Sequence, residues 1–201
     1  RNYAEHVREM GSDPKSTPPV FFTKPADAVV ASGAEIPYPQ ATEDLHFEGE
    51  LVIALKSGGR NISASGAEAL IFGYAAGCDL TRRDLQAAAK NAGSPWDAAK
   101  GFDHSAPVGA ILPAAKAGAI AGARLVLSVN GVKRQDAPLA DMIWSVPEII
   151  AALSKLFELK AGDLIFTGTP SGVGPLQAGD KVEVKIGALP PLAFGIGPAQ
   201  G

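Results

Sequence analysis

The sequence predicts an α+β fold built around a mixed β-sheet. Patterns typical of strands outnumber those typical of helices, and the two do not alternate in the regular order of a doubly wound parallel sheet. The 23 glycines and 16 prolines are spread along the chain instead of collecting in a linker. The 201 residues contain no repeat or low-complexity tract, so we expect residues 1–201 to form a single domain.

The predicted strands are short runs in which apolar residues alternate with polar ones or stand together. These runs are residues 20–23, 48–55, 125–129, 164–167 and 181–186. Asn130 and Gly131 follow the third run. Because this pair readily adopts positive φ at both positions, it is the strongest hairpin signal in the chain.

Three segments are predicted to be helical. Ser145 and Glu148 form the S-x-x-E pattern of a capping box, ahead of an apolar helical face in IIAALSKLF. Residues 66–76 are expected to form a second, shorter helix, and residues 82–92 a third. Helices should therefore be few and short.

The composition narrows the classes of function. A net charge of −3 offers no basic footprint for nucleic acid or an anionic membrane. No apolar stretch approaches the ~20 residues of a membrane helix, and no signal-peptide pattern is present. Cys78 is the only cysteine, which excludes an internal disulfide and a multi-cysteine zinc site and favours the cytoplasm. The chain begins at Arg1 rather than Met, which leaves open whether a targeting segment precedes it.

Two glutamates lie two positions apart in HFEGELVIAL. In an extended chain Glu48 and Glu50 share a face, about 6–7 Å apart, and repel each other. A third acid, Asp79, occurs in GYAAGCDLTRRD, and the fold could bring it close. Three carboxylates form an all-oxygen site that suits Mg²⁺, Mn²⁺ or Ca²⁺ rather than zinc. The alternative for the two glutamates is a solvent-facing strand edge.

Other residues are candidates for acid–base or electrostatic roles. In RNYAEHVREMG, His6 and Glu9 would share one helical face, where the carboxylate raises the basicity of the imidazole. The pair is a candidate general base for water, and an exposed ion pair is the alternative. Lys100, in SPWDAAKGFDHSAP, could neutralise a substrate carboxylate or a developing enolate, or it could simply be solvated. Arg83 and Gln86 follow the third acid at helical spacing and could present donors to a ligand.

The glycine-rich segment TGTPSGVGP, residues 167–175, directly follows a predicted strand. It lacks the G-K-[ST] ending of a phosphate-binding P-loop. Its N–H groups could form a nest for a carboxylate, although a plain turn is an equal alternative. His46 could support the paired glutamates, and His104 is expected only to close a turn.

Taken in order, these segments resemble the fumarylacetoacetate hydrolase family. The resemblance runs from about residue 1 to residue 186 and is carried by RNYAEHVREMG, FTKP, LHFEGEL, GYAAGCDLTRRDLQ, PWDAAKGFD and TGTPSGVGP. Within the family, NYAEHVREM and PWDAAKGFDHSAP are most similar to the fumarylpyruvate hydrolases and related acylpyruvases. The tail GALPPLAFGIGPAQG follows the family pattern poorly, and family members normally carry further residues before the NYAEH segment.

The resemblance implies a mixed β-sandwich roll, usually a homodimer, that hydrolyses the C–C bond of a 3-acylpyruvate. The expected substrate is fumarylpyruvate, an intermediate of aromatic catabolism. The resemblance also implies Mg²⁺ or Mn²⁺ bound by Glu48, Glu50 and Asp79, and a water-activating pair at His6 and Glu9. The remaining matched positions are an enolate-supporting lysine and residues that contact substrate or lie near the site: Lys100, Arg83, Gln86, Thr169 and Lys24.

Other reactions of the family are alternatives. Oxaloacetate decarboxylation, hydroxymuconate-type isomerisation and sugar-acid dehydration start from a similar 2-oxo acid enolate. The His6–Glu9 pair argues for hydrolysis, because isomerisation needs no activated water. Arg83 and Lys24 would suit a second carboxylate and favour a dicarboxylic acyl chain. A catalytically silent binding protein is the remaining alternative; it predicts loss of the acidic triad or of the His–Glu pair, and all five residues are present.

Overall fold

The computed structural model describes residues 2–4 and 18–199, which fold mainly into three β-sheets. The strands are β1 (Val29–Ala31), β2 (Glu35–Pro37), β3 (Leu45–Phe47), β4 (Gly49–Leu55), β5 (Ile71–Cys78), β6 (Thr81–Arg82), β7 (Ala106–Val108), β8 (Leu112–Pro113), β9 (Arg124–Val129), β10 (Val132–Pro138), β11 (Leu164–Phe166), β12 (Gly174–Pro175), β13 (Lys181–Ile186) and β14 (Leu192–Gly197). The α-helices are α2 (Ala64–Ala67), α3 (Arg83–Ala92), α4 (Asp97–Lys100), α5 (Ala114–Ala117) and α6 (Val146–Leu156). Short 3-10 helices are η1 (Ala26–Ala28), η2 (Glu68–Leu70), η3 (Ile120–Gly122) and η4 (Leu139–Asp141).

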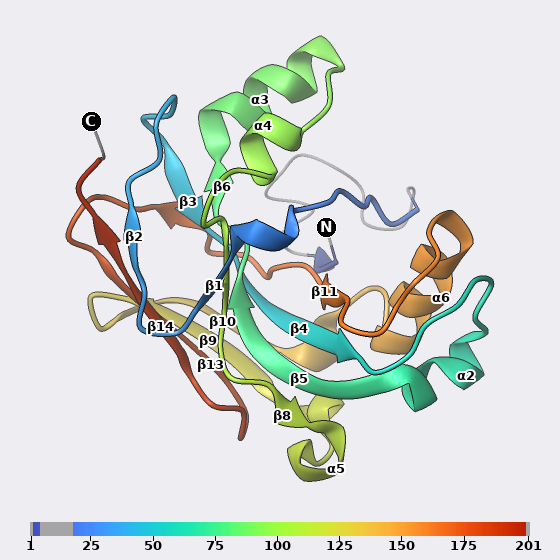
Figure 1. Ribbon diagram of the computed structural model, residues 1–201. Helices are drawn as coiled ribbons and strands as arrows, with labels where there is room; N and C mark the ends of the chain where they lie inside the picture. Colours follow the sequence, from blue (N-terminus) through green and yellow to red (C-terminus); the bar gives the residue numbers. More distant parts are fainter. Residues whose placement is uncertain (1, 5–17, 200–201) are drawn as a thin grey trace.

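Two larger sheets enclose the hydrophobic core. One has the order β1-β7-β5-β4-β11, with β8 also paired to β5, and the other has the order β10-β9-β13-β14-β2. Both are mixed, because β1–β7 and β14–β2 pair in parallel and the other pairs are antiparallel. Figure 1 shows the two sheets packed together, with α3 and α4 on one side of them and α2 and α6 on another. The predicted α+β class with few, short helices is confirmed.

Strand β4 carries the predicted acidic pair and divides its side chains between two environments. Leu51 and Ile53 point into the core between the sheets, whereas Val52 packs with Ala75 of β5 on the opposite face. Because side chains alternate along a strand, Glu50 shares the face of Val52 and points away from the main core. The prediction of a strand over residues 48–55 is confirmed to within one residue.

The predicted helix over residues 66–76 is wrong. Helix α2 ends at Ala67, η2 ends at Leu70, and the residues from Ile71 onward form β5. Strand β5 lies inside the six-stranded sheet with neighbours on both sides, and nearly all of it is buried. A strand buried on both faces reads as a continuous apolar run, which periodicity alone does not separate from a buried helix. Asp79 therefore follows a strand, not a helix.

The strand predicted over residues 20–23 is also wrong. These residues belong to no strand, because no segment in the described part of the chain pairs with their backbone in a sheet. They line a cavity instead.

None of the described helices has the length and apolar character needed to cross a membrane.

The remaining local predictions are confirmed. Strands β9, β11 and β13 occupy three of the predicted runs, and α3 and α6 occupy two of the predicted helices. Asn130 has φ of 52° and Gly131 has φ of 77°, and they join β9 to β10 as a hairpin. The Ser145 N–H donates to Glu148 Oε2 at 2.8 Å, which completes the capping box of α6.

Candidate active site

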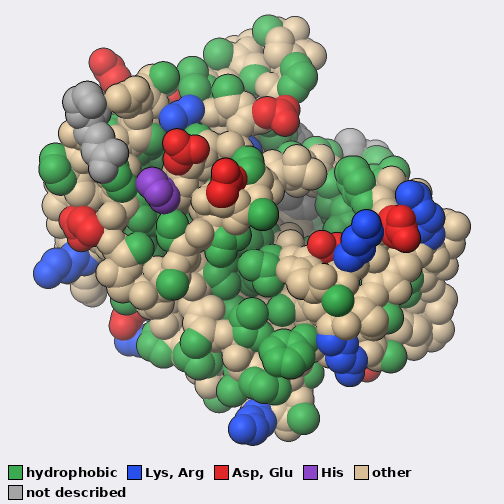
Figure 2. Space-filling model, viewed as in Figure 1, with side chains coloured by type: hydrophobic (Ala, Val, Ile, Leu, Met, Phe, Trp, Pro, Cys, Tyr) green, Lys and Arg blue, Asp and Glu red, His purple; other side chains and the backbone are tan. Residues whose placement is uncertain are grey.

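A cavity of about 650 Å³ lies against β4, β11, α3, α4 and α6. Figure 2 shows this face hollowed between the lobe of α3 and α4 and the lobe of α6. The predicted site residues that line it are Lys24, Glu48, Glu50, Asp79, Arg83, Gln86, Lys100 and Thr169. His6 and Glu9 lie outside the described residues. The structure therefore brings together every predicted site residue that it describes.

The three acids converge because two strands end side by side. Strands β4 and β5 are antiparallel and pair Gly49 with Cys78, so Glu48 and Asp79 lie next to each other at the ends of the two strands. The Asp79 N–H donates to the Glu48 carbonyl at 2.8 Å. All three residues are buried. Each offers one carboxylate oxygen, and these three oxygens all lie within 4.8 Å of one another. A compact group of hard oxygen donors fits Mg²⁺ or Mn²⁺ better than zinc.

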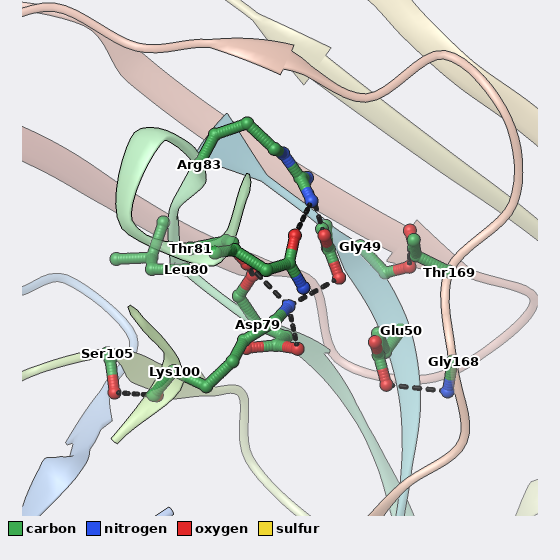
Figure 3. A network of polar contacts seen from close by, with 12 residues as sticks. Gly49, Glu50, Asp79, Leu80, Thr81, Arg83, Lys100, Ser105, Gly168 and Thr169 are labelled. Atoms are coloured by element: carbon green, nitrogen blue, oxygen red, sulfur yellow. Dashed lines mark hydrogen bonds and ion pairs between the residues drawn. The ribbon is translucent and has the colours of Figure 1, made fainter. Parts of the chain in front are cut away.

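Lys100 ends helix α4 and reaches into this acidic group. Its ammonium Nζ lies 2.9 Å from Glu48 Oε2, 2.7 Å from Asp79 Oδ2 and 2.6 Å from Thr81 Oγ1. Figure 3 shows the Lys100 side chain directed toward Asp79 and Thr81. Burial opposes the charged form, but the carboxylates of Asp79 and Glu48 outweigh it and raise the pKa of Lys100. The residue is therefore a buried ammonium and not the solvated lysine that its sequence surroundings also allowed.

Two further cations contact the acidic group. Arg83 Nη2 lies 2.6 Å from Glu48 Oε1, and its Nη1 donates to Gln86 Oε1 at 2.5 Å. Lys24 Nζ lies 2.8 Å from Asp79 Oδ1 and donates to the carbonyls of Leu80, at 3.1 Å, and of Lys100. Both side chains are thus held by protein oxygens. If the substrate has a second carboxylate, that group would bind Arg83 and Lys24 while they also contact the acidic group.

Glu50 has a different environment. Its Oε2 accepts from the Gly168 N–H at 2.6 Å, and none of the described lysine or arginine side chains forms an ion pair with it. Burial and the nearby carboxylates of Asp79 and Glu48 raise the pKa of Glu50 to about 8. Among the described residues this carboxyl group has no positive ion-pair partner, and a divalent cation among the three acids would provide one. The residues present therefore fit a metal ion.

Gly168 belongs to the predicted glycine-rich loop, at a position where the backbone requires glycine. Its φ of 94° lies in the left-handed region, and a Cβ atom would stand 2.7 Å from Asn2 Cβ. The loop does present a backbone N–H to a carboxylate, as the sequence suggested, but that carboxylate is Glu50 of the protein itself.

Three polar residues that hold the site were not predicted from the sequence. Asn2 donates to the carbonyls of Thr167 and Trp144, each at 2.9 Å, and Thr81 accepts from Lys100. Both lie in segments that carry the family resemblance, NYAEH and DLTRRD, so their motifs were a usable signal. Gln135 donates to Thr169, but no local pattern marks it.

His46 pairs with an acid outside the group of three, and His104 closes a turn. His46 Nε2 lies 2.9 Å from Asp44 Oδ1, and this pairing replaces the contact with the two glutamates that the sequence suggested. His104 has φ of 60° and lies in a turn, which confirms the expectation that it closes one.

Known proteins share this sequence and fold over most of the chain. A family model described as "Fumarylacetoacetate (FAA) hydrolase C-terminal" matches residues 1–197. A fumarylpyruvate hydrolase of a Ralstonia species is 42% identical over 180 residues, which cover 90% of this chain and 93% of the relative. An oxaloacetate tautomerase of Escherichia coli K12 is 43% identical over 186 residues, which cover 92% of this chain and 84% of the relative.

A solved structure agrees closely with the fold. The crystal structure of fumarylpyruvate hydrolase from Pseudomonas aeruginosa in complex with Mn²⁺ and pyruvate matches this chain with a TM-score of 0.96 and 46% sequence identity. The match covers 98% of this chain and 87% of that chain. The expectation of this family's fold is thereby confirmed.

Proposed function

The chain belongs to the fumarylacetoacetate hydrolase family, and from that premise we propose that it is a metal-dependent hydrolase of a 3-acylpyruvate, with fumarylpyruvate as its substrate. The observation that carries the proposal is the convergence of Glu48, Glu50 and Asp79 beside the buried ammonium of Lys100, in a cavity large enough for a small acid. The similarity to fumarylpyruvate hydrolases supports the choice of substrate.

We assign Mg²⁺ or Mn²⁺ to Glu48, Glu50 and Asp79, and a bound ion of this kind would supply positive charge to the oxygens of the 2-oxo acid. Lys100 places a second, fixed positive charge beside the same carboxylates. A pyruvate enolate is a poor leaving group in water, and a preformed cation beside it lowers the free energy of the transition state.

In the proposed reaction, His6 and Glu9 act as the base that takes a proton from water. The water oxygen forms a bond to the distal acyl carbonyl carbon, and the π electrons of that carbonyl move onto its oxygen. As the carbonyl re-forms, the C–C bond breaks and its electron pair passes into the pyruvate enolate, whose charge Lys100 stabilises. The proton held by His6 returns to the enolate carbon to give pyruvate, and the new carboxyl group of fumarate loses its proton to water.

The residues of helix α3 in the cavity wall favour a substrate whose acyl group carries a negative charge. Arg83, Gln86 and Lys90 lie three and four residues apart, on one face of the helix, and all three line the cavity. A fumaryl group ends in a carboxylate, whereas an acetyl group does not. We therefore favour a dicarboxylic substrate over acetylpyruvate.

A panel of substrates tests the proposal. The protein is assayed with fumarylpyruvate, acetylpyruvate and oxaloacetate, with Mg²⁺ or Mn²⁺ and after treatment with a chelator. We expect metal-dependent release of fumarate and pyruvate from fumarylpyruvate, faster than acetate from acetylpyruvate. No release from either acylpyruvate, together with conversion of oxaloacetate, would contradict hydrolysis.

Oxaloacetate tautomerisation is a second candidate function. The specific observation in its favour is that the tautomerase of Escherichia coli is 43% identical to this chain, which is as similar as the fumarylpyruvate hydrolase at 42%. Tautomerisation moves a proton and breaks no C–C bond, so it needs no activated water. Decarboxylation of oxaloacetate and isomerisation of a hydroxymuconate-type diacid would use the same group of acids.

Replacing His6 with alanine is expected to slow hydrolysis by a factor of about 10², because the water loses its general base. Mn²⁺ binding should not change, since His6 is not assigned to the metal. The measurements are kcat with fumarylpyruvate and the Mn²⁺ dissociation constant from calorimetry. His104→Asn is the matched control, because His104 is an exposed turn residue and asparagine tolerates its positive φ. Near-normal hydrolysis by His6→Ala would overturn the assignment of the base.

The remaining assignments concern the whole protein. We propose that residues 1–201 act as one catalytic domain and that the protein is a cytoplasmic homodimer. The lone Cys78 is a buried free thiol, which suits a reducing compartment. Light scattering of the purified protein measures the number of subunits directly.

A further inference from the structure

Gln135 joins the strand of the two glutamates to the glycine-rich loop. The Gly49 N–H donates to Gln135 Oε1 at 2.9 Å, and Gln135 Nε2 donates to Thr169 Oγ1 at 2.7 Å and to the Pro170 carbonyl at 2.8 Å. Gly49 is the residue between Glu48 and Glu50. Gln135 is only 1% exposed, so its amide makes these contacts away from water.

The local backbone makes room for this amide. The pairing of β10 with β9 shifts register between Lys133 and Gln135, and this irregularity lets Gln135 turn inward from a largely exposed strand end. A Cβ atom on Gly49 would lie 3.1 Å from Gln135 Oε1, so the glycine between the two glutamates leaves space for the amide. Gly172 of the loop packs even more closely, because its Cβ would lie 2.3 Å from the Arg134 carbonyl oxygen.

The hydrogen bonds close into a ring that fixes the direction of each one. Gly49 N–H can only donate and the Pro170 carbonyl can only accept, so the Gln135 amide has one possible orientation. Its Nε2 must donate to Thr169 Oγ1, and the single proton of the Thr169 hydroxyl then goes to the Gly49 carbonyl, 2.8 Å away. The ring therefore holds both the N–H and the C=O of Gly49.

The Thr169 hydroxyl consequently has no proton left to donate to a substrate. The family resemblance places Thr169 among substrate-contacting residues, yet its hydroxyl is directed into the protein and the residue is buried. Gly168, one residue earlier, donates to Glu50, so the same loop touches both the backbone and a side chain of the acidic group.

We propose that Gln135 and Thr169 are positioning residues of the metal centre. They act through the Gly49 peptide, which sets the relative placement of Glu48 and Glu50, and through the loop that carries the Gly168 N–H. The inference rests on the proposed function, because it assigns a task to residues around the proposed metal ligands. Residues that orient metal ligands in this way typically change metal affinity or activity by about 10- to 100-fold when mutated.

Thr169→Val and Thr169→Ser form the first test, because valine has nearly the same shape without the hydroxyl and serine keeps it. For Thr169→Val we expect Mn²⁺ affinity to fall about 10-fold and kcat about 10- to 100-fold, with little change in KM. Thr169→Ser should restore both values. A rise in KM with unchanged Mn²⁺ affinity would instead show a direct contact with substrate and would overturn the proposal.

Gln135→Glu forms the second test, because glutamate keeps an acceptor for Gly49 N–H but loses the two donated bonds. We expect weaker Mn²⁺ binding and lower kcat, as for Thr169→Val. Since the two residues share one ring, the double variant should be within about threefold of the worse single variant, not at the product of the two losses. Multiplicative losses would show independent roles and contradict the ring. Gln177→Glu, at an exposed glutamine, is the matched control and should match the wild type.

The Mn²⁺ titration is done without substrate, so it separates this inference from the proposed function. If the wild type binds Mn²⁺ but does not hydrolyse fumarylpyruvate, the proposed function fails and the ring is still tested by metal affinity. If Gln135→Glu does not fold, as judged by circular dichroism, the Thr169 pair decides the result. Wild-type Mn²⁺ affinity and kcat in Thr169→Val would overturn the inference.

Discussion

Replacing Glu48 with glutamine is expected to remove nearly all turnover while the protein stays folded. The change keeps the size of the side chain but removes one of the three carboxyl groups that converge in the cavity wall. A hard divalent cation binds an amide oxygen more weakly than a carboxylate, so metal affinity should fall steeply. Because the developing enolate charge then loses the cation that would stabilise it, we expect kcat/KM to fall by more than about 10³.

The fold should tolerate this change because the cations around Glu48 keep other partners. Lys100 retains Asp79 Oδ2 at 2.7 Å and Thr81 Oγ1 at 2.6 Å, and Arg83 retains Gln86 Oε1 at 2.5 Å. The far-ultraviolet circular dichroism spectrum should therefore match the wild type. Glu48→Ala should abolish turnover in the same way, with a somewhat larger loss of stability, since it also leaves a space among these groups.

Calorimetric titration with Mn²⁺ and steady-state assays with fumarylpyruvate measure the two effects. Glu43→Gln is the matched control, because Glu43 is exposed, precedes β3 and does not line the cavity. It should bind Mn²⁺ and turn over as the wild type does. A Glu48→Gln protein that kept full Mn²⁺ affinity would remove Glu48 from the metal centre.

Much of the fold could be predicted because its signals are local. The Asn130-Gly131 turn, the capping box at Ser145 and the alternation in residues 181–186 each describe a contact within a few residues. Strand β5 could not be recognised in the same way. Its hydrogen bonds go to β4, β7 and β8, and its apolar run fits a buried strand and a buried helix equally well.

The residues of the candidate site likewise fall into those that local sequence indicates and those that only the fold reveals. The two glutamates are two residues apart, so a strand places them together. Asp79 and Lys100 were candidates from their own segments, and the family resemblance then implied their roles as a metal ligand and an enolate-supporting lysine. Gln135 lies 86 residues from Gly49 and contributes through an irregular strand pairing and two closely packed glycines. No local pattern reports such a contact. The residues proposed to perform chemistry were thus accessible from motifs, whereas the residue proposed to position them could be found only from the fold.

Replacing Lys100 with methionine should separate the stability of the site from its chemistry. Lys100 is 2% exposed, and methionine is a flexible side chain of similar length. Without metal, the variant leaves Glu48 and Asp79 buried with less positive charge beside them. Removing one partner of a buried ion pair typically costs about 3–5 kcal/mol, so the melting temperature of the metal-free protein should fall.

Mn²⁺ should restore that stability but not the activity. The ion no longer competes with the Lys100 ammonium for Glu48 Oε2 and Asp79 Oδ2, so its affinity should equal or exceed that of the wild type, and binding to the folded state stabilises it. The enolate still lacks its second cation, so kcat should remain about 10²–10³ below the wild type at saturating Mn²⁺. Melting curves with and without Mn²⁺, and kcat at saturating metal, measure these effects.

Lys116→Met is the matched control for this variant, because Lys116 is an exposed residue of α5 outside the cavity. It should change neither measurement. Recovery of kcat together with stability would show that Lys100 serves only to balance the acids in the absence of metal. Loss of Mn²⁺ binding would show that its ammonium organises the acids for the ion. If Mn²⁺ restores stability while activity stays lost, the result would show that the positive charge of Lys100 stabilises the transition state.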